Sequence, residues 1–445
     1  MSPFVSSTKR WPRLGAILVA FVTLATGLGI RVVNADAAAP PVPAVEGPIT
    51  GPGPMYAGMR AVPPGTDTVD FRYLTEEYFV SGTANGQPYK TRVVVRRPSN
   101  PETFSGFVQA EPTHFSGNAL IFQAARVGIM QRRDVAIDIA ARNTNNITLF
   151  KAFNPARYAS LNIPDPGQTN EILAQVGELV KSNSFRGGLT GYAVRHIILS
   201  GTSDSSNVVR AYLGVHSGFT MPDSSPIYDG YFLTATLGNT PLPAVSDVPM
   251  VQMPTQTEVN SNAAAGDAYR RPDSDAPNNR FRLYEVAGMS HADSRDSPPV
   301  SSCDLPLSSL PYGAFTFMGL QHLFDWISPG TPPPHMASYI AVDNDLANDG
   351  SRLDLDQFGN AKGGVRNTYV DVPVAKYGIP NSGPGQCSLL GYQTPLPATT
   401  VAELYKNRGL YVSRVNARLE DLIREGWFPP EYADVVRSDA QGSST

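Results

Sequence analysis

Residues 195–206, RHIILSGTSDSS, decide the prediction of the fold. A buried strand is expected to lead into a helix within this segment. Residues 195–200 form a short apolar run bounded by turn residues, which is typical of a strand covered on both faces. Helical spacing of apolar residues follows over 207–215. The G-x-S-x-[GS] pattern at 201–205 lies between these two segments. It predicts a strained turn that holds the Ser203 hydroxyl at the end of the sheet, although a helix-capping serine is the simpler alternative.

Strand-like and helix-like segments alternate on both sides of this turn. The patterns predict strands at 69–80, 89–96, 104–110, 134–140, 248–253 and 281–286, and helices at 119–130 and 171–180. A turn near Asn85-Gly86 makes the first two strands an antiparallel pair. The later alternation predicts an α/β protein with a mostly parallel central sheet and helices on both faces. Functional sites of such sheets lie at the carboxyl ends of the strands.

The first residues of the chain have the pattern of an export signal. Lys9, Arg10 and Arg13 precede an uncharged run over 14–30, and small residues at Ala35 and Ala37 follow it. This pattern predicts a secretory signal peptide over 1–37, with an uncleaved membrane anchor as the alternative. No later run is long enough to cross a bilayer. We therefore expect a secreted or extracytoplasmic protein without a stable membrane span after cleavage.

The remaining chain divides into three parts by composition. Residues 38–66 are rich in Pro and Gly and lack periodicity, which predicts an extended lead-in over a surface. Residues 67–445 are expected to form the main domain, with a C-terminal extension from about residue 300. In that extension, 310–326 and 404–423 have helical spacing. We expect the extension to form a cap or side layer that walls a pocket.

Composition and charge exclude several classes of protein. With 445 residues, of which 41% are hydrophobic, the chain can bury a large core. Removal of residues 1–37 takes away four basic residues and one acidic residue, so the formal net charge falls from −4 to −7. No cluster of Lys and Arg remains, so a nucleic-acid partner is not expected. No heptad pattern is present from which an oligomer could be predicted.

The cysteines and the acidic loops predict a disulfide and no metal or cofactor. In an exported protein the only two cysteines, Cys303 and Cys387, are expected to form one disulfide. They have no nearby His pair, which argues against zinc. Residues 345–350 with Asp356 superficially resemble a calcium loop, but Ala347 occupies a ligand position, so a solvated turn is favoured.

A nucleophilic serine requires a base, and His291 is the best placed of the six histidines. It lies in a glycine-containing loop directly after the predicted strand 281–286, which could return the imidazole to the edge of the sheet that carries Ser203. His196 and His216 are expected to be structural, because they begin a strand and end a helix. Of the other three, His114 lies in the loop 111–117, His322 lies on an amphipathic stretch, and His335 follows three prolines.

The base in turn requires a carboxylate that orients it. Glu258 follows the predicted strand 248–253 and is expected in the loop beyond its end, which gives the order Ser, acid, His of the α/β-hydrolases. Asp267, Asp273 and Asp275 remain loop alternatives. Asp247 precedes that strand and should lie at the wrong edge.

Acyl transfer also needs donors for a developing oxyanion. We expect one from the backbone amide of Asp204, directly after the serine. A second is expected from the loop 111–117, EPTHFSG, through the amide of Thr113 or His114, because Pro112 has no N–H.

These motifs together resemble the bacterial alpha/beta hydrolase domain family, whose members are mostly predicted secreted esterases. The resemblance covers nearly all of residues 65–435 and is carried by the segments GTSDS (201–205), VP (248–249), TEV (257–259), FRLYEVAG (281–288), HAD (291–293), GTPPP (330–334) and FGNAKGGVR (358–366). It implies an α/β-hydrolase fold and a triad of Ser203, Glu258 and His291, with Glu258 at a position that is usually Asp. Two departures are Ser205, where relatives often have Gly, and the EPTHFSG loop.

The expected function is therefore that of a secreted serine hydrolase. It would cleave a small-molecule or lipid-like carboxylic ester through an acyl-enzyme intermediate. The alternative is a secreted binding protein that uses the same fold without turnover, which would be favoured if Ser203 had no base within reach.

Overall fold

The computed structural model describes residues 38–295, 302–343 and 350–442. All of them belong to one compact unit, Asp36–Thr445. The predicted signal peptide over 1–37 and residues 345–349 of the calcium-like stretch lie outside the described residues. Within the described ranges, no helix combines the length and the apolar character that crossing a bilayer requires.

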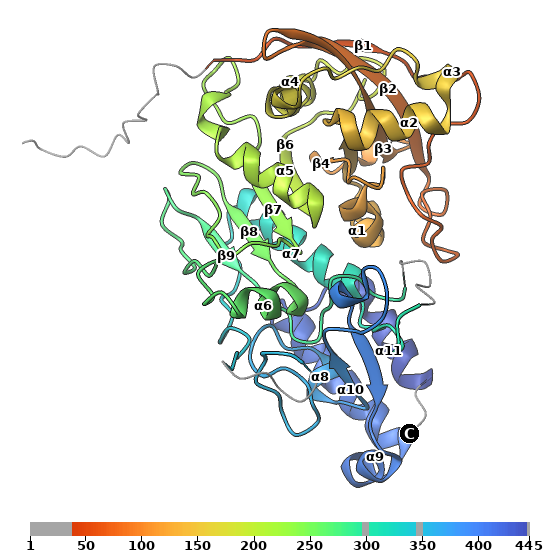
Figure 1. The fold of residues 1–445 in the computed structure, drawn as a ribbon, viewed down its shortest axis with the longest axis vertical. Helices are drawn as coiled ribbons and strands as arrows, with labels where there is room; N and C mark the ends of the chain where they lie inside the picture. The colour runs from red at the N-terminus through yellow and green to blue at the C-terminus, as the bar shows by residue number, and fades with distance from the viewer. Residues whose placement is uncertain (1–37, 296–301, 344–349, 443–445) are drawn as a thin grey trace, which may run out of the picture. The chain divides into compact units, whose positions relative to one another are not determined.

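A nine-stranded sheet lies at the centre, in the order β1-β2-β3-β5-β4-β6-β7-β8-β9. Its strands are β1 (Ala44–Glu46), β2 (Tyr73–Ala84), β3 (Gln87–Pro98), β4 (Phe107–Pro112), β5 (Val135–Ile139), β6 (His196–Thr202), β7 (Gly230–Thr234), β8 (Met250–Met253) and β9 (Phe281–Leu283). Neighbours from β1 through β3 to β5 pair antiparallel, and all pairs from β5 to β9 are parallel (Figure 1). The prediction of a mostly parallel sheet is confirmed.

Two strands are absent from the sequence-based prediction. β7 is a short run of aromatic and apolar residues, GYFLT, that pairs with both β6 and β8. β1 lies inside the predicted lead-in and pairs with β2. Both are short and lack a clear alternating pattern, so their assignment depends on the neighbouring strands that supply their hydrogen bonds.

Helices cover both faces of the sheet. They are α1 (Leu120–Gln131), α2 (Thr148–Phe153), α3 (Pro155–Tyr158), α4 (Thr169–Lys181), α5 (Asp204–Leu213), α6 (Gln256–Ala263), α7 (Tyr312–Ile327), α8 (Thr368–Asp371), α9 (Ala398–Tyr405), α10 (Arg408–Arg424) and α11 (Ala433–Gly442). Side chains of a strand alternate between faces. In β6, Ile197 and Leu199 join the core under α4 and α5, whereas Ile198 joins the core under α1 and α7. This double burial explains why β6 is an almost continuous apolar run.

The layer beyond residue 300 begins with a helix of the central fold. α7 contacts β7, β8 and α1 directly, so it covers the sheet and is not part of an added cap. α8 to α11 and the two-stranded sheet of β10 (Ala375–Gly378) and β11 (Tyr392–Pro395) follow it. The helical spacing predicted over 404–423 is interrupted, because Asn407 caps a new helix by accepting a hydrogen bond from the amide of Leu410 at 3.0 Å.

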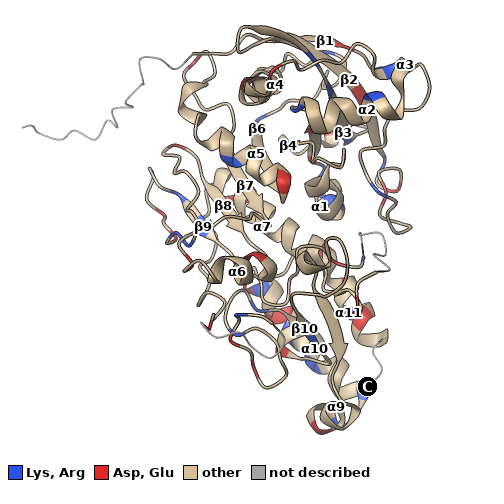
Figure 2. Cartoon of the chain, viewed as in Figure 1, with Lys and Arg blue, Asp and Glu red and all other residues tan. Residues whose placement is uncertain are grey.

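A buried group of charges fastens the lead-in to the sheet. Lys and Arg are otherwise interspersed with Asp and Glu along the chain (Figure 2). Glu77 of β2 is buried and accepts hydrogen bonds from Arg92 Nε at 2.5 Å and from Arg157 Nε at 2.6 Å. The same arginines donate to backbone carbonyls of the lead-in, Arg92 to Tyr56 and Arg157 to Ile49. The lead-in therefore belongs to the folded unit and does not simply lie over a surface.

We expect Glu77→Ala to lower the free energy of unfolding by about 3–5 kcal/mol, because it removes the carboxylate that two buried guanidinium groups share. Urea denaturation followed by circular dichroism measures this. The matched control is Glu76→Ala at the neighbouring position, where the side chain is 27% exposed in its pair with Arg97. Its loss should cost less than about 1 kcal/mol. Equal effects of the two substitutions would contradict the role of the buried network.

Candidate active site

The turn between β6 and α5 holds Ser203 in a strained conformation. Its φ is 53° and its ψ is −124°, which a residue other than glycine rarely adopts. The Ser203 amide donates to the Thr234 carbonyl at the end of β7 at 3.2 Å. Gly201 allows the close approach of strand and helix, because a Cβ there would lie 2.6 Å from the Ser205 carbonyl oxygen. The strand–turn–helix context predicted for this motif is present.

Ser205 closes the same turn with its side chain. Its Oγ accepts a hydrogen bond from the Thr202 amide at 3.0 Å and donates to the Thr202 carbonyl at 2.9 Å. Ser205 is fully buried, so these two bonds satisfy its hydroxyl. The departure from the usual glycine therefore adds a cross-link within the turn and does not disturb it.

The three residues expected to form a triad lie in one chain of hydrogen bonds. The Ser203 Oγ lies 3.0 Å from His291 Nε2, and His291 Nδ1 lies 2.6 Å from Glu258 Oε1. Nδ1–H donates to the carboxylate, so the neutral imidazole presents an unprotonated Nε2 to the serine. This is the geometry in which an imidazole removes a proton from a hydroxyl group.

Glu258 lies in the first turn of α6, and not in a loop as the sequence suggested. Thr255 is the N-cap of this helix, and Glu258 completes a capping box with it. Glu258 Oε2 accepts from the Thr255 amide at 2.9 Å and from the Thr255 hydroxyl at 2.5 Å. The carboxylate thus caps a helix with one oxygen and binds the imidazole with the other. The T-x-x-E spacing was the sequence signal for this helix.

The start of α6 also fixes the loop that carries His291. The Gln256 side chain accepts a hydrogen bond from the Gly288 amide at 2.6 Å. The Gln256 backbone amide donates to the Met289 carbonyl at 2.7 Å. The Thr257 hydroxyl accepts from the His291 amide at 3.2 Å. Sequence reasoning had assigned no role to Gln256 or to the Thr257 hydroxyl. Both residues hold the backbone of the loop from which the His291 imidazole projects.

Nearby charges set the protonation of the site. Burial opposes the charged form of His291, but the charge of Glu258 and its hydrogen bond outweigh burial and raise the pKa of the imidazole. Beside Ser203, the Asp204 carboxylate pairs with Arg142, with 3.1 Å between Nη1 and Oδ1. Burial opposes ionisation of Asp204, but the Arg142 hydrogen bond and charge hold its pKa below the ordinary value. Arg142 had no role in the sequence-based prediction.

The backbone donors expected for an oxyanion are only partly available. The Asp204 amide begins α5 and donates to no carbonyl among the described residues. The Thr113 amide, however, donates to the Ile139 carbonyl at 2.9 Å, and the His114 amide donates to the Asn118 carbonyl at 3.0 Å. The expectation that Thr113 or His114 supplies a free amide is therefore corrected. The Thr113 amide continues the pairing of β4 with β5, and the His114 amide closes the loop.

The other candidate residues have separate partners. His216 contacts Tyr231 and Asp247, and His322 contacts the Gly426 carbonyl. The alternative carboxylates are paired away from His291, Asp267 with Arg270, Asp273 with His335, and Asp275 with Arg282. Among the described residues, Glu258 is the carboxylate that contacts His291.

A cavity of about 560 Å³ opens beside Ser203 and His291. Its apolar lining comes from α1, through Leu120 and Ala124, and from the segment between β10 and β11, through Leu389 and Leu390. Residues 384–386 of that segment also line the cavity. The C-terminal extension was expected to wall a pocket, and residues 384–390 belong to it, but no local pattern indicates which of its segments would do so.

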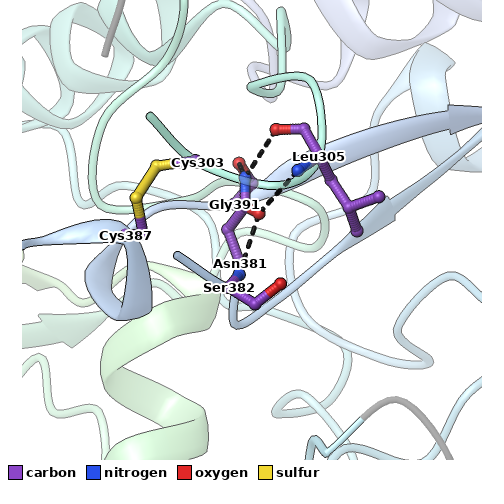
Figure 3. Close-up of a disulfide and its surroundings, with 6 residues drawn as sticks. All are labelled: Cys303, Leu305, Asn381, Ser382, Cys387 and Gly391. Carbon is purple, nitrogen blue, oxygen red and sulfur yellow. Dashed lines mark hydrogen bonds between the residues drawn. A yellow bond between two sulfur atoms is a disulfide. The ribbon is translucent and has the colours of Figure 1, made fainter. Parts of the chain in front are cut away.

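A disulfide fastens this wall to the loop before α7. Cys303 and Cys387 are bonded, as predicted, and lie 84 positions apart in the sequence. Figure 3 shows the Asn381 side chain beside this disulfide, between two backbone segments. Asn381 accepts from the Leu305 amide at 3.2 Å and donates to the carbonyls of Leu305 at 2.9 Å and Gly391 at 3.4 Å. The wall is therefore held by one covalent bond and several hydrogen bonds.

Comparison with known proteins agrees with this architecture. The family model described as "Alpha/beta hydrolase domain" matches residues 45–437. The chain belongs to the alpha/beta hydrolase domain family. The match includes the three residues of the hydrogen-bonded chain and the disulfide-bonded wall. No curated protein is similar to this chain in sequence.

Solved structures of alpha/beta hydrolases are similar at low identity. Esterase Est22 is 11% identical with a TM-score of 0.30, and the match covers 42% of this chain and 66% of that chain. A putative dienelactone hydrolase from Klebsiella pneumoniae subsp. pneumoniae MGH 78578 is 15% identical with a TM-score of 0.35. In that case the match covers 58% of this chain and 99% of the other.

We expect the double substitution Cys303→Ser with Cys387→Ser to lower the free energy of unfolding by about 4 kcal/mol, because a long loop of the unfolded chain is no longer closed. The cavity wall at 384–390 should also loosen. Thermal denaturation with and without reductant measures the first effect. Reductant should lower the melting temperature of the wild type to that of the variant. An unchanged melting temperature in both cases would contradict a stabilising role.

Proposed function

We propose that this chain is a serine hydrolase that cleaves a carboxylic ester. The observation that carries the proposal is the unbroken chain from Ser203 Oγ through His291 to Glu258, at 3.0 Å and 2.6 Å, beside a cavity. Ser203 would attack the ester carbonyl while His291 takes its proton. His291 would then return that proton to the departing alcohol, and water would release the acyl group by the same steps.

Glu258 would stabilise the imidazolium formed during each proton transfer. It is buried and already carries two hydrogen bonds from Thr255, so it cannot turn away from His291 without losing its partners. The alternative of a binding protein without turnover would be favoured by a serine without a base. Ser203 has a base at hydrogen-bonding distance, which supports the enzyme.

The cavity supports a small-molecule or lipid-like ester as the substrate. Leu120, Ala124, Leu389 and Leu390 give it an apolar wall on which an acyl or alcohol chain can pack. Its volume of about 560 Å³ is large enough for a group of moderate size.

We also propose that the protein acts outside the cytoplasm. The disulfide between Cys303 and Cys387 supports this, because disulfides persist in oxidising compartments. The signal-like pattern of the first 37 residues supports the same location.

A fluorophosphonate probe should label the wild-type protein at Ser203. Labelling requires a serine activated by a base, so Ser203→Ala should abolish it and should also abolish hydrolysis of p-nitrophenyl acetate. Mass spectrometry of the labelled peptide identifies the serine. The matched control is Ser206→Ala in the same helix, which should retain labelling. Absence of labelling in a folded wild-type sample would rule out the proposed function.

The rate of ester hydrolysis should fall on acidification, with a midpoint above the ordinary histidine pKa of about 6.5. His291 must be neutral to accept a proton, and Glu258 raises its pKa, so the protonated form persists to higher pH. Measurement of kcat/KM from about pH 5 to about pH 9 gives this midpoint.

Glu258→Gln tests the cause of this shift. Gln can still fill the capping box, so the fold should persist. The acidic limb should move to lower pH because the charge is lost, and kcat should fall by about 10³-fold or more. An unchanged midpoint in this variant would show that Glu258 does not set the protonation of His291.

A further inference from the structure

In the loop between β4 and α1, the backbone amides of residues 113–117 all have acceptors within the protein. Beyond the amides of residues 113 and 114, the Phe115 amide donates to Asp204 Oδ2 at 3.2 Å, and the Gly117 amide donates to the His114 carbonyl at 2.8 Å. The Ser116 amide donates to His114 Nδ1 at 3.2 Å. Because these five amides are engaged, a donor from this loop to the oxyanion can instead come from a side chain.

The contact between Ser116 and His114 determines where the imidazole of His114 carries its hydrogen. A backbone N–H can only donate, so Nδ1 must accept and carries no hydrogen. The Ser116 hydroxyl lies 2.9 Å from the same nitrogen, and it accepts from Asn118 Nδ2 at 3.1 Å, so it too can donate to Nδ1. We assign the neutral ring the tautomer with its hydrogen on Nε2.

His114 stays neutral in the range in which His291 acts as a base. Burial lowers the pKa of His114 to about 4. The charge of Asp204 opposes this effect, while Arg142, His291 and Arg60 add to it. Since these are the charged groups that face the ring, the imidazole is a neutral donor near pH 7.

The position of His114 places this donor beside the serine. The residue is only 6% exposed, yet it lines the cavity together with Ser203 and His291. Its Nε2 makes no hydrogen bond with the described residues and is therefore available to a molecule in the cavity. The Phe115 amide and Arg142 both bind the Asp204 carboxylate, which fixes the loop to the turn that carries Ser203.

We propose that His114 is a catalytic residue whose Nε2–H donates a hydrogen bond to the carbonyl oxygen of the ester, together with the amide of Asp204. This proposal rests on the proposed esterase function. As Ser203 Oγ bonds to the carbonyl carbon, the π electrons move to that oxygen, and His291 holds the serine proton. His114 keeps its own proton throughout. The oxyanion collapses, the alcohol leaves with the proton from His291, and the acyl-enzyme remains.

Two substitutions at the same position separate the donor from the contact with Ser116. Asn keeps an acceptor near the place of Nδ1 but has no donor at the place of Nε2. Gln places an amide N–H near Nε2. We expect His114→Asn to lower kcat by about 100-fold with little change in KM, which is the usual effect of removing one oxyanion donor. His114→Gln should retain at least about a tenth of the wild-type kcat.

A trifluoromethyl ketone, which forms a tetrahedral oxyanion on the serine, provides the second measurement. For His114→Asn its inhibition constant should rise by the same factor as kcat/KM falls, because both report the oxyanion. The matched control is His335→Asn, at a histidine whose side chain is 52% exposed and lies outside the cavity. It should leave kcat and the inhibition constant at wild-type values.

Several results would overturn the role of His114. A folded His114→Asn variant with kcat within about threefold of wild type would do so, as would a large fall in kcat with an unchanged inhibition constant. If His114→Asn does not fold, a large loss of kcat in a folded His114→Gln variant would overturn the role as well. Failure of the proposed function is distinct, because the wild type would then neither hydrolyse esters nor react with the fluorophosphonate.

Discussion

The buried charge of Glu258 constrains the whole site. A carboxylate without solvent requires hydrogen bonds to each oxygen, and this one obtains them from the Thr255 cap and from His291. The same carboxylate therefore caps α6 with one oxygen and aligns the imidazole with the other. The same carboxylate raises the pKa of His291, so it sets both the position and the basicity of the imidazole.

The serine is positioned by a different balance of forces. The strained backbone of Ser203 is maintained by the Thr234 carbonyl on one side and by the Ser205 hydroxyl on the other. Since β7 supplies that carbonyl, the short strand stabilises the turn as well as the sheet. Strain of this kind persists only where the surroundings determine the conformation several times over, and this turn meets that condition.

The wall opposite the sheet comes from the C-terminal third of the chain. The segment between β10 and β11 reaches the cavity because Cys387 is bonded to Cys303, and the Asn381 side chain ties the same two regions together. The apolar contacts of α10 and α11 join the core that lies under α1 and α7. The cavity thus combines the edge of the sheet with a covalently fastened wall.

Local sequence patterns were sufficient for the parallel sheet, the turn at Ser203 and the disulfide. Each depends on residues close in the chain, or on cysteines that had one possible partner. The same patterns selected Ser203, Glu258 and His291 from the order of strand ends, and the structure brings these three together. Strand β7 has no strong local pattern, because its assignment depends on pairing with β6 and β8. Glu258 belongs to a helix and not to a loop, because it completes a capping box with Thr255.

Only the tertiary structure decided which hydrogen-bonding groups remain available. Whether the amides of Thr113 and His114 face a substrate depends on the carbonyls of Ile139 and Asn118, and the sequence does not show that these lie nearby. The burial of Glu77 with Arg92 and Arg157, which joins the lead-in to the sheet, has the same origin. Sequence determines which groups a residue brings and the local turn it favours. The fold determines which of those groups already have partners, because donors such as the Thr113 amide are satisfied by atoms far away in the chain.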